Sequence, residues 1–193
     1  QTFPYGGFAS WPGSWHGWGN RQTQALAEAA GAGLIADEAR EAAVAEANTL
    51  FAHLLVEGWQ HEMLFPTGSA RTFEQIAYAV RTVTVGLLRV HALTGESRYA
   101  VMAGLAASWL TGNNAAGAVM ADPATGHGYD GILSPTRVNP NAGAESTIEA
   151  QFALLDVEQV PTAARWLGAT ATAPQTVIDG DRTLRFRAFR ATD

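Results

Sequence analysis

The chain has 193 residues, of which 47% are hydrophobic and 16% charged, and its net charge is −6. This length and composition predict one folded domain with its own core and exclude a disordered chain. An acidic balance without a basic run argues against nucleic acid or an anionic membrane as a partner, and it suits a neutral ligand better than a polyanion.

Other classes are excluded by what the sequence lacks. It has no cysteine, so disulfides and thiolate metal sites are excluded. No apolar run approaches the ~20 residues of a membrane span, and the first residues do not resemble a signal peptide. The histidines show no metal-ligand spacing and no phosphate- or dinucleotide-binding motif occurs, so we expect no metal and no cofactor. The cellular compartment stays open.

The first 55 residues predict a loop followed by two helices. Residues 1–19 combine aromatic side chains with five glycines, which predicts an ordered aromatic loop and not a regular element. A helix is expected from Asn20 to about Leu34. Asp37 then begins a stronger helix, whose first turn is acidic. Its apolar stripe contains Ala43, Ala47, Leu50, Phe51, Leu54 and Leu55.

The middle of the chain predicts an antiparallel helical hairpin. Thr72 and Gln75 form a capping-box pattern before an apolar helix that stops at Gly95. The next helix begins almost at once and ends near Leu110, with Gly112 as a C-cap. A joint this short between two helices makes an antiparallel pair.

A fifth helix is expected from about Gly143 to Val157, and alternation around residues 179–182 predicts a β-hairpin at the C-terminal end. The predicted fold is therefore all-α, built from antiparallel helical hairpins over residues 1–173, with a small β-hairpin tail over 174–193. Alanine-rich helices pack closely and leave little room inside a bundle, so a ligand site is expected at the helix ends. We expect the loops of residues 8–20, 112–132 and 139–145 to gather at one end.

Glu145 is the first candidate for chemistry, because it lies in the first turn of the fifth helix. A helix N-terminus normally stabilises an ionised carboxylate, so one interpretation is a Glu that only stabilises its helix. The other is a general acid, which needs desolvation or a neighbouring carboxylate. Asp130, in a glycine-flanked turn, is the nearest candidate neighbour. Glu149, one turn further on, is expected to make a surface ion pair.

Aromatic and amide side chains form a second group of candidates. Aromatic faces suit the apolar faces of sugar rings, while His and Asn can bond hydroxyl groups. The alternatives are that the rings fill the base of the core and that the amides cap helices and turns. Trp59, Trp109 and Trp166 are expected in the core. The candidate substrate-binding residues are Trp15, His16, Trp18, Asn20, Asn113, Asn114, Tyr129 and Asn139.

Three segments resemble a known family. Trp109-Leu-Thr-Gly-Asn-Asn-Ala-Ala-Gly117 resembles the ending of the penultimate helix of family 9 glycoside hydrolases. Asn139-Pro-Asn-Ala-Gly-Ala-Glu-Ser-Thr-Ile148 is similar to that family's final catalytic helix. The whole pattern is more similar still to bacterial proteins of the six-hairpin, or (α/α)6, glycosidase type, and Ser10–Asn20 resembles an aromatic loop of the same toroid. The resemblance covers about residues 8–158.

The resemblance implies part of an (α/α)6 toroid, a carbohydrate substrate and Glu145 as the general acid. The family's activating Asp pair lies in an N-terminal half that this sequence does not contain, and Gly126–Asp130 replaces its His-His-Arg substrate loop. We therefore expect a missing N-terminal half or a homo-oligomer that covers an exposed apolar surface. The alternatives to a hydrolase are a non-catalytic module that binds glycan or protein, and a sugar epimerase or lyase, since a fold does not fix a reaction.

Overall fold

The computed structural model describes residues 5–18 and 20–192, so residues 1–4 and 19 of the predicted aromatic loop and residue 193 of the predicted tail lie outside the described residues. The helices are α1 Gln22–Gly31, α2 Asp37–Glu46, the π-helix η1 Ala47–Phe51, α3 Ala52–Glu57, α4 Ala77–Thr94, α5 Ser97–Ala107, the 3-10 helix η2 Ser108–Thr111, α6 Ala144–Glu158 and α7 Pro161–Ala164. The strands are β1 Ser14–His16, β2 Glu62–Leu64, β3 Ser69–Arg71, β4 Gln75–Ile76, β5 Gly131–Ser134, β6 Arg137–Asn139, β7 Thr170–Ala171, β8 Gln175–Asp179, β9 Arg182–Phe186 and β10 Phe189–Arg190.

The prediction of an all-α toroid segment is wrong. The protein is mixed α/β, with 44% of residues helical and 19% in strands. The described part of the chain has ten strands in four small sheets, ordered β1-β2-β3, β4-β5-β6, β7-β10 and β8-β9. Most of these strands have two to four residues, too few for a periodic pattern to show. Some pair with distant segments, as where β1 of the expected aromatic loop pairs with β2, and others form short local hairpins, β2–β3 and β5–β6.

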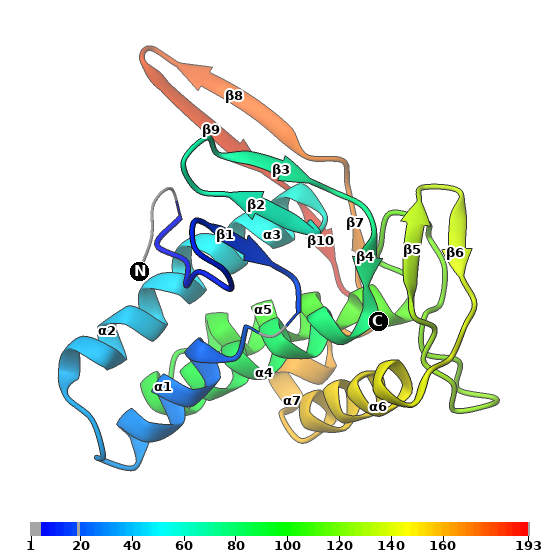
Figure 1. Cartoon of the computed structure of the whole chain (residues 1–193), viewed down its shortest axis with the longest axis horizontal. Helices are drawn as coiled ribbons and strands as arrows, with labels where there is room; N and C mark the ends of the chain where they lie inside the picture. Colours follow the sequence, from blue (N-terminus) through cyan, green and yellow to red (C-terminus); the bar gives the residue numbers. More distant parts are fainter. Residues whose placement is uncertain (1–4, 19, 193) are drawn as a thin grey trace.

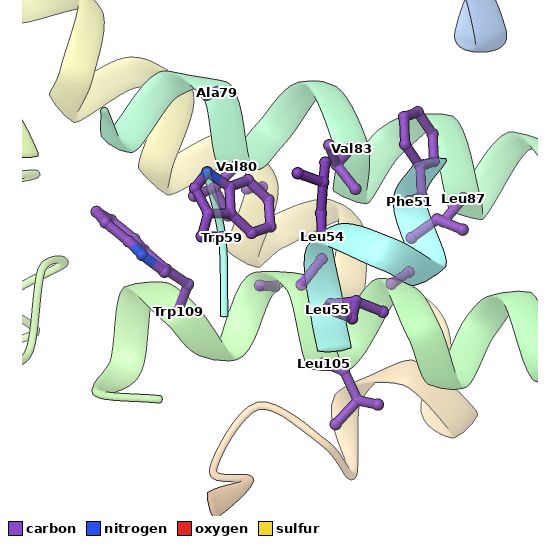
Figure 2. Packing of buried hydrophobic residues seen from close by; sticks show 14 of the residues in the cluster. Phe51, Leu54, Leu55, Trp59, Ala79, Val80, Val83, Leu87, Leu105 and Trp109 are labelled. Carbon is purple, nitrogen blue, oxygen red and sulfur yellow. The ribbon is translucent and has the colours of Figure 1, made fainter. Parts of the chain in front are cut away.

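The expected helices are present with shifted ends, and α4 lies at the centre. It packs against α1, α5 and α6 (Figure 1). Gly95 ends α4 and Gly112 ends η2, each with a positive φ that glycine adopts without steric cost. Trp59 and Trp109 are buried, as predicted, and Trp166 is partly buried against the same core. Figure 2 shows Leu54 and Trp59 in the space between α4 and α5.

The capping box at Thr72 and Gln75 is a further wrong prediction. Gln75 lies in β4, where it pairs with Ile132 of β5, and α4 begins only at Ala77. The buried amide of Gln75 accepts a hydrogen bond from Trp109 Nε1 (3.0 Å) and donates one to Gly58 O (3.4 Å). A side chain that joins two buried segments in this way is not available to cap a helix.

The C-terminal hairpin predicted from alternation is formed by β8 and β9, which extend away from the helices (Figure 1). It is tied to the helical part by Arg185, whose Nη2 lies 2.8 Å from Glu57 Oε2 at the end of α3. The expected boundary at residues 173 and 174 is crossed by the pairing of β10 with β7. The tail therefore packs back onto the segment that precedes it.

One face of α6 is apolar and half-exposed, although the guanidinium of Arg81 lies 4.9 Å from the centroid of the Phe152 ring. Ile148, Phe152 and Leu155 follow one another at helical spacing, and each is about half exposed (50%, 48% and 51%). The opposite face, which includes Ala150, Ala153 and Val157, is buried against the core. Of the helices in the described residues, none combines the length and apolar character needed to cross a bilayer.

A buried carboxyl group joins the N-terminal segment to the helices. Glu46, at the end of α2, is fully buried, and its Oε1 accepts a hydrogen bond from Phe8 N (2.6 Å). Its Oε2 accepts a short hydrogen bond from the Thr23 hydroxyl of α1. Burial raises the pKa of Glu46 from 4.5 to about 7, against the opposing effect of these hydrogen bonds.

We predict that Glu46 makes folding stability depend on pH. Because its pKa is higher in the folded than in the unfolded chain, its contribution is fully present below pH 4.5 and is lost as pH rises through about 7. Glu46→Gln cannot ionise. Urea unfolding at a series of pH values should therefore show the variant gaining about 3 kcal/mol relative to the wild type between pH 4 and pH 8. Parallel stability curves for the two proteins would contradict this.

Candidate functional site

The carboxylate of Asp130 caps helix α6 from outside the helix. Its Oδ1 accepts hydrogen bonds from Ser146 Oγ (2.7 Å) and from Gly143 N (3.2 Å). Gly143 is the N-cap residue of α6 and has no side chain with which to satisfy the free N–H groups of the first turn. A negative charge at this end also interacts favourably with the helix dipole. Asp130 therefore fixes the first turn of α6, which carries Glu145.

The backbone of Asp130 holds α4 at the same junction. Its carbonyl accepts a hydrogen bond from Ala77 N (2.9 Å), the first residue of α4, and its N–H donates to Asn141 O (2.7 Å). The glycines nearby permit this close packing. A Cβ at Gly128 would lie 2.6 Å from Ser146 O, and one at Gly131 would lie 2.3 Å from Gln75 O. The glycine-rich turn is thus required by two backbone approaches, one to α6 and one to β4.

Two cavities meet at this junction. The first, of about 340 Å³, is lined by Glu74, Tyr78, Asp130, Asn139 and Glu145 together with Ile76, Gly143, Ala144 and Ser146. The second, of about 270 Å³, is lined by Trp18, Arg21, Tyr78, Thr82, Glu145 and Glu149. Because they share Tyr78 and Glu145, we treat them together as the Glu145 cleft.

Tyr78, in the first turn of α4, faces several carboxylates. Its pKa is raised by partial burial and then by the negative charges of Glu145, Glu74 and Asp130. The phenol therefore stays protonated at neutral pH and can donate a hydrogen bond into the cleft. Glu145 itself is exposed.

Glu149 forms an ion pair with each of two arginines, and an ion pair of this residue was predicted. Its two oxygens lie 2.7 Å from Arg21 Nη2 and 2.9 Å from Arg81 Nη1. With only 15% of its side chain exposed, this carboxylate is held between two guanidinium groups. The unpaired acidic character of the cleft therefore lies around Glu74 and Glu145.

Of the predicted aromatic residues, Trp18 lines the cleft and the others do not. Its ring lies between those of His16 (centroids 5.0 Å apart) and His61 (5.1 Å), and 6.4 Å from that of Tyr78. Trp15 and His16 are instead buried in β1. Burial lowers the pKa of His16, whose Nδ1 accepts a hydrogen bond from Trp18 N (3.3 Å). Their position supports the core interpretation.

The predicted amides divide in a similar way. Asn139 lines the cleft. Asn20 is buried and donates to Phe8 O (3.4 Å), so it holds the N-terminal segment. Asn114 uses its amide for four hydrogen bonds to the backbone, with Trp109 O, Ala118 O, Ala116 N and Ala118 N. Asn113 and Asn114 line a different cavity, and Tyr129 packs against the core.

Sequence reasoning missed Tyr78, Glu74 and Arg21. Neither Tyr78 nor Glu74 stands out in the sequence, since both fall within the segment expected to begin an apolar helix. What brings both to Glu145 is the sheet β4-β5-β6, in which β5 pairs with β4 and with β6 and so places the start of α4 beside the start of α6. The glycines on both sides of Asp130 were the available signal, because they mark close backbone approaches.

No family model matches the chain, and no curated protein matches it. Within residues 5–18 and 20–192, no group of three or more His, Asp or Glu side chains could hold a metal ion.

We predict that Asp130 stabilises the junction. Asp130→Ala leaves the first turn of α6 without its cap and should lower the free energy of unfolding by about 1–2 kcal/mol. Ser146→Ala removes one of the two hydrogen bonds and should cost less. In a double-mutant cycle by urea unfolding, the two losses should be smaller together than their sum, because the variants share one interaction. Strict additivity would show that the Asp130–Ser146 hydrogen bond is not formed.

Proposed function

We propose that the protein is a carbohydrate-active protein of the glycoside hydrolase type, which acts on an oligo- or polysaccharide in the Glu145 cleft. One observation carries the proposal: Glu145, Glu74 and Asp130 line a single cavity together with the Tyr78 phenol, beside the ring of Trp18. Glycoside hydrolysis needs two carboxyl groups on either side of the scissile bond. An aromatic face beside them suits the apolar face of a sugar ring.

Each residue has a distinct proposed role. Glu145, held at the first turn of α6, protonates the leaving oxygen, as the resemblance also implies. Glu74 is the better candidate for the second carboxylate, because Asp130 already accepts two hydrogen bonds from α6. Tyr78 donates a hydrogen bond to a sugar oxygen, and Trp18 stacks on the ring. The acidic lining favours a neutral sugar over a polyanionic one.

The alternative is a non-catalytic module that binds a glycan in the same cleft. Two observations favour it: Glu145 is exposed to solvent, and Asp130 serves as a helix cap. A binding module needs Trp18 and the hydrogen-bonding groups but no proton transfer. The two proposals therefore differ in what the Glu145 carboxyl does.

The substitution Glu145→Gln distinguishes the hydrolase from the binding module. The amide keeps the size of the side chain but cannot donate a proton to a leaving group, so turnover of a natural oligosaccharide should fall at least ~10²-fold. Loss on an activated aryl glycoside, whose leaving group needs little protonation, should be much smaller. Oligosaccharide binding, measured by calorimetry, should be retained.

Glu158→Gln, on the same helix outside the cleft, is the matched control and should keep full turnover. Equal loss on both substrates would contradict the role of Glu145 as the acid. If the wild-type chain binds oligosaccharides through Trp18 but never hydrolyses them, the binding module is correct. Glu74→Gln and Asp130→Asn, compared at equal fold content, identify the second carboxylate.

A second copy of the chain is the partner we propose for the half-exposed apolar face of α6. Large exposed apolar patches commonly mark interfaces, and three apolar side chains lie in a row on this face. Sedimentation should show self-association that Leu155→Glu weakens. Leu34→Glu, which changes an exposed leucine between α1 and α2, should have no such effect. A monomeric wild type at all concentrations would contradict this proposal.

A further inference from the structure

A third cavity, separate from the Glu145 cleft, lies between the end of η2 and strand β7. Its volume is about 340 Å³, and its walls are formed by residues 111–114 and 168–171 and by Arg187. Most of this lining is backbone and small side chains. The guanidinium of Arg187 is its only charged group among the described residues.

Arg187 differs from the other arginines of the described chain. Arg21, Arg71, Arg81, Arg89, Arg98 and Arg185 each lie within 4.0 Å of a carboxylate. The remaining arginines apart from Arg187 are exposed. Arg187 is half-buried, and none of the described carboxylates lies within 4.0 Å of it. Glu57, the nearest acidic influence, is held by Arg185 at 2.8 Å.

The structure fixes the guanidinium but leaves its outer end unused. Arg187 Nε donates to Thr172 O (2.7 Å), and the group packs close to Gly58, where a Cβ would lie 2.8 Å from Nη1. Neither terminal nitrogen donates a hydrogen bond to a described residue. Burial holds the pKa of Arg187 below its usual value, and the guanidinium lies 5.6 Å from the centroid of the Phe189 ring, an aromatic contact that uses neither terminal nitrogen as a hydrogen-bond donor to an oxygen.

We propose that this cavity binds a carboxylate group through the two terminal nitrogens of Arg187. A planar guanidinium matches a carboxylate with two parallel hydrogen bonds, and a partly desolvated cation is stabilised by such a partner. Asn113, whose Nδ2 donates to Ser108 Oγ (2.8 Å), also lines the cavity, and no described residue donates to its amide oxygen, which leaves that oxygen for a ligand hydroxyl. The volume accommodates a small organic acid or one uronic acid residue.

NMR titration of the ¹⁵N-labelled chain at constant ionic strength tests the proposal. Glucuronate should give saturable shifts in residues 112–114 and 168–171 and at Arg187 Nε, whereas glucose should not. Acetate distinguishes the two sources of the group: binding of acetate indicates recognition of any small acid, and binding of glucuronate alone indicates a sugar acid. Failure of the Glu145 cleft to hydrolyse a glycoside would leave this result unchanged.

Variants assign the binding to Arg187. Arg187→Gln should weaken glucuronate binding about tenfold or more, as expected for the loss of charged hydrogen bonds. Arg187→Lys should retain only part of the wild-type affinity. Arg182→Gln removes an equal charge from the exposed strand β9 and should leave affinity unchanged. Because Arg187→Gln could disturb packing, Thr170→Glu is the second variant: it places a carboxylate at the exposed rim and should block binding while the fold is kept.

Three outcomes would overturn the proposal. The first is the absence of saturable shifts with either acid, and the second is equal loss of affinity in Arg187→Gln and Arg182→Gln. The third is binding of glucose as tight as that of glucuronate, which would show that the cavity recognises a sugar ring without its charge.

Discussion

The arrangement of the candidate site depends on one carboxylate, that of Asp130. Its side chain accepts two hydrogen bonds from the first turn of α6, while its own carbonyl accepts the first N–H of α4. These two helices are distant in sequence, and each carries one of the residues shared by both cavities, Tyr78 and Glu145. A cap supplied from a neighbouring strand therefore does more than stabilise a helix end, because it sets the distance between two functional groups.

This arrangement constrains the chemistry. A carboxylate that accepts hydrogen bonds from a helix N-terminus is stabilised as an acceptor, which suits a structural role better than the activation of water. The carboxylate of Glu74 accepts no such hydrogen bond from a described residue, since only the backbone oxygen of Glu74 is bonded, to His61 Nδ1. Glu145 lies on the open side of the cleft, where a sugar ring stacked on Trp18 would remove water from it. Under the proposed function, Glu145 would therefore act as an acid only with a sugar in place.

Sequence periodicity predicted the elements whose stability is local. Helices α1, α5 and α6, the end of α4 at Gly95 and the hairpin β8–β9 all follow from apolar spacing, helix-ending glycines and alternation. The missed elements are short strands. β1, β4 and β7 are held by distant partners, whereas β2–β3 and β5–β6 are local hairpins too short for alternation to show. In β4, the polar side chain and position of Gln75 imitated a helix cap. The residues of the candidate site divide in the same way. Glu145 and Asp130 were predicted from helix-end and turn chemistry. Tyr78 and Glu74 were not, because they reach those residues only through β4–β5 pairing. Trp15 and His16 looked equivalent to Trp18, yet pairing of β1 with β2 buried both of them.

The net charge of −6 averages over two cavities of opposite character. In the Glu145 cleft the nearby arginines are paired with Glu149, so the rest of the lining is acidic. In the cavity beside β7 the relation is reversed, because Arg185 engages Glu57 and leaves Arg187 without a close carboxylate. In each case a neighbouring ion pair decides the sign of the charge that remains inside. Overall charge therefore predicts the ligand of neither cavity. A single substitution outside the cavity, such as the loss of Arg185, would free Glu57 to pair with Arg187 and make the second cavity neutral without any change in its lining.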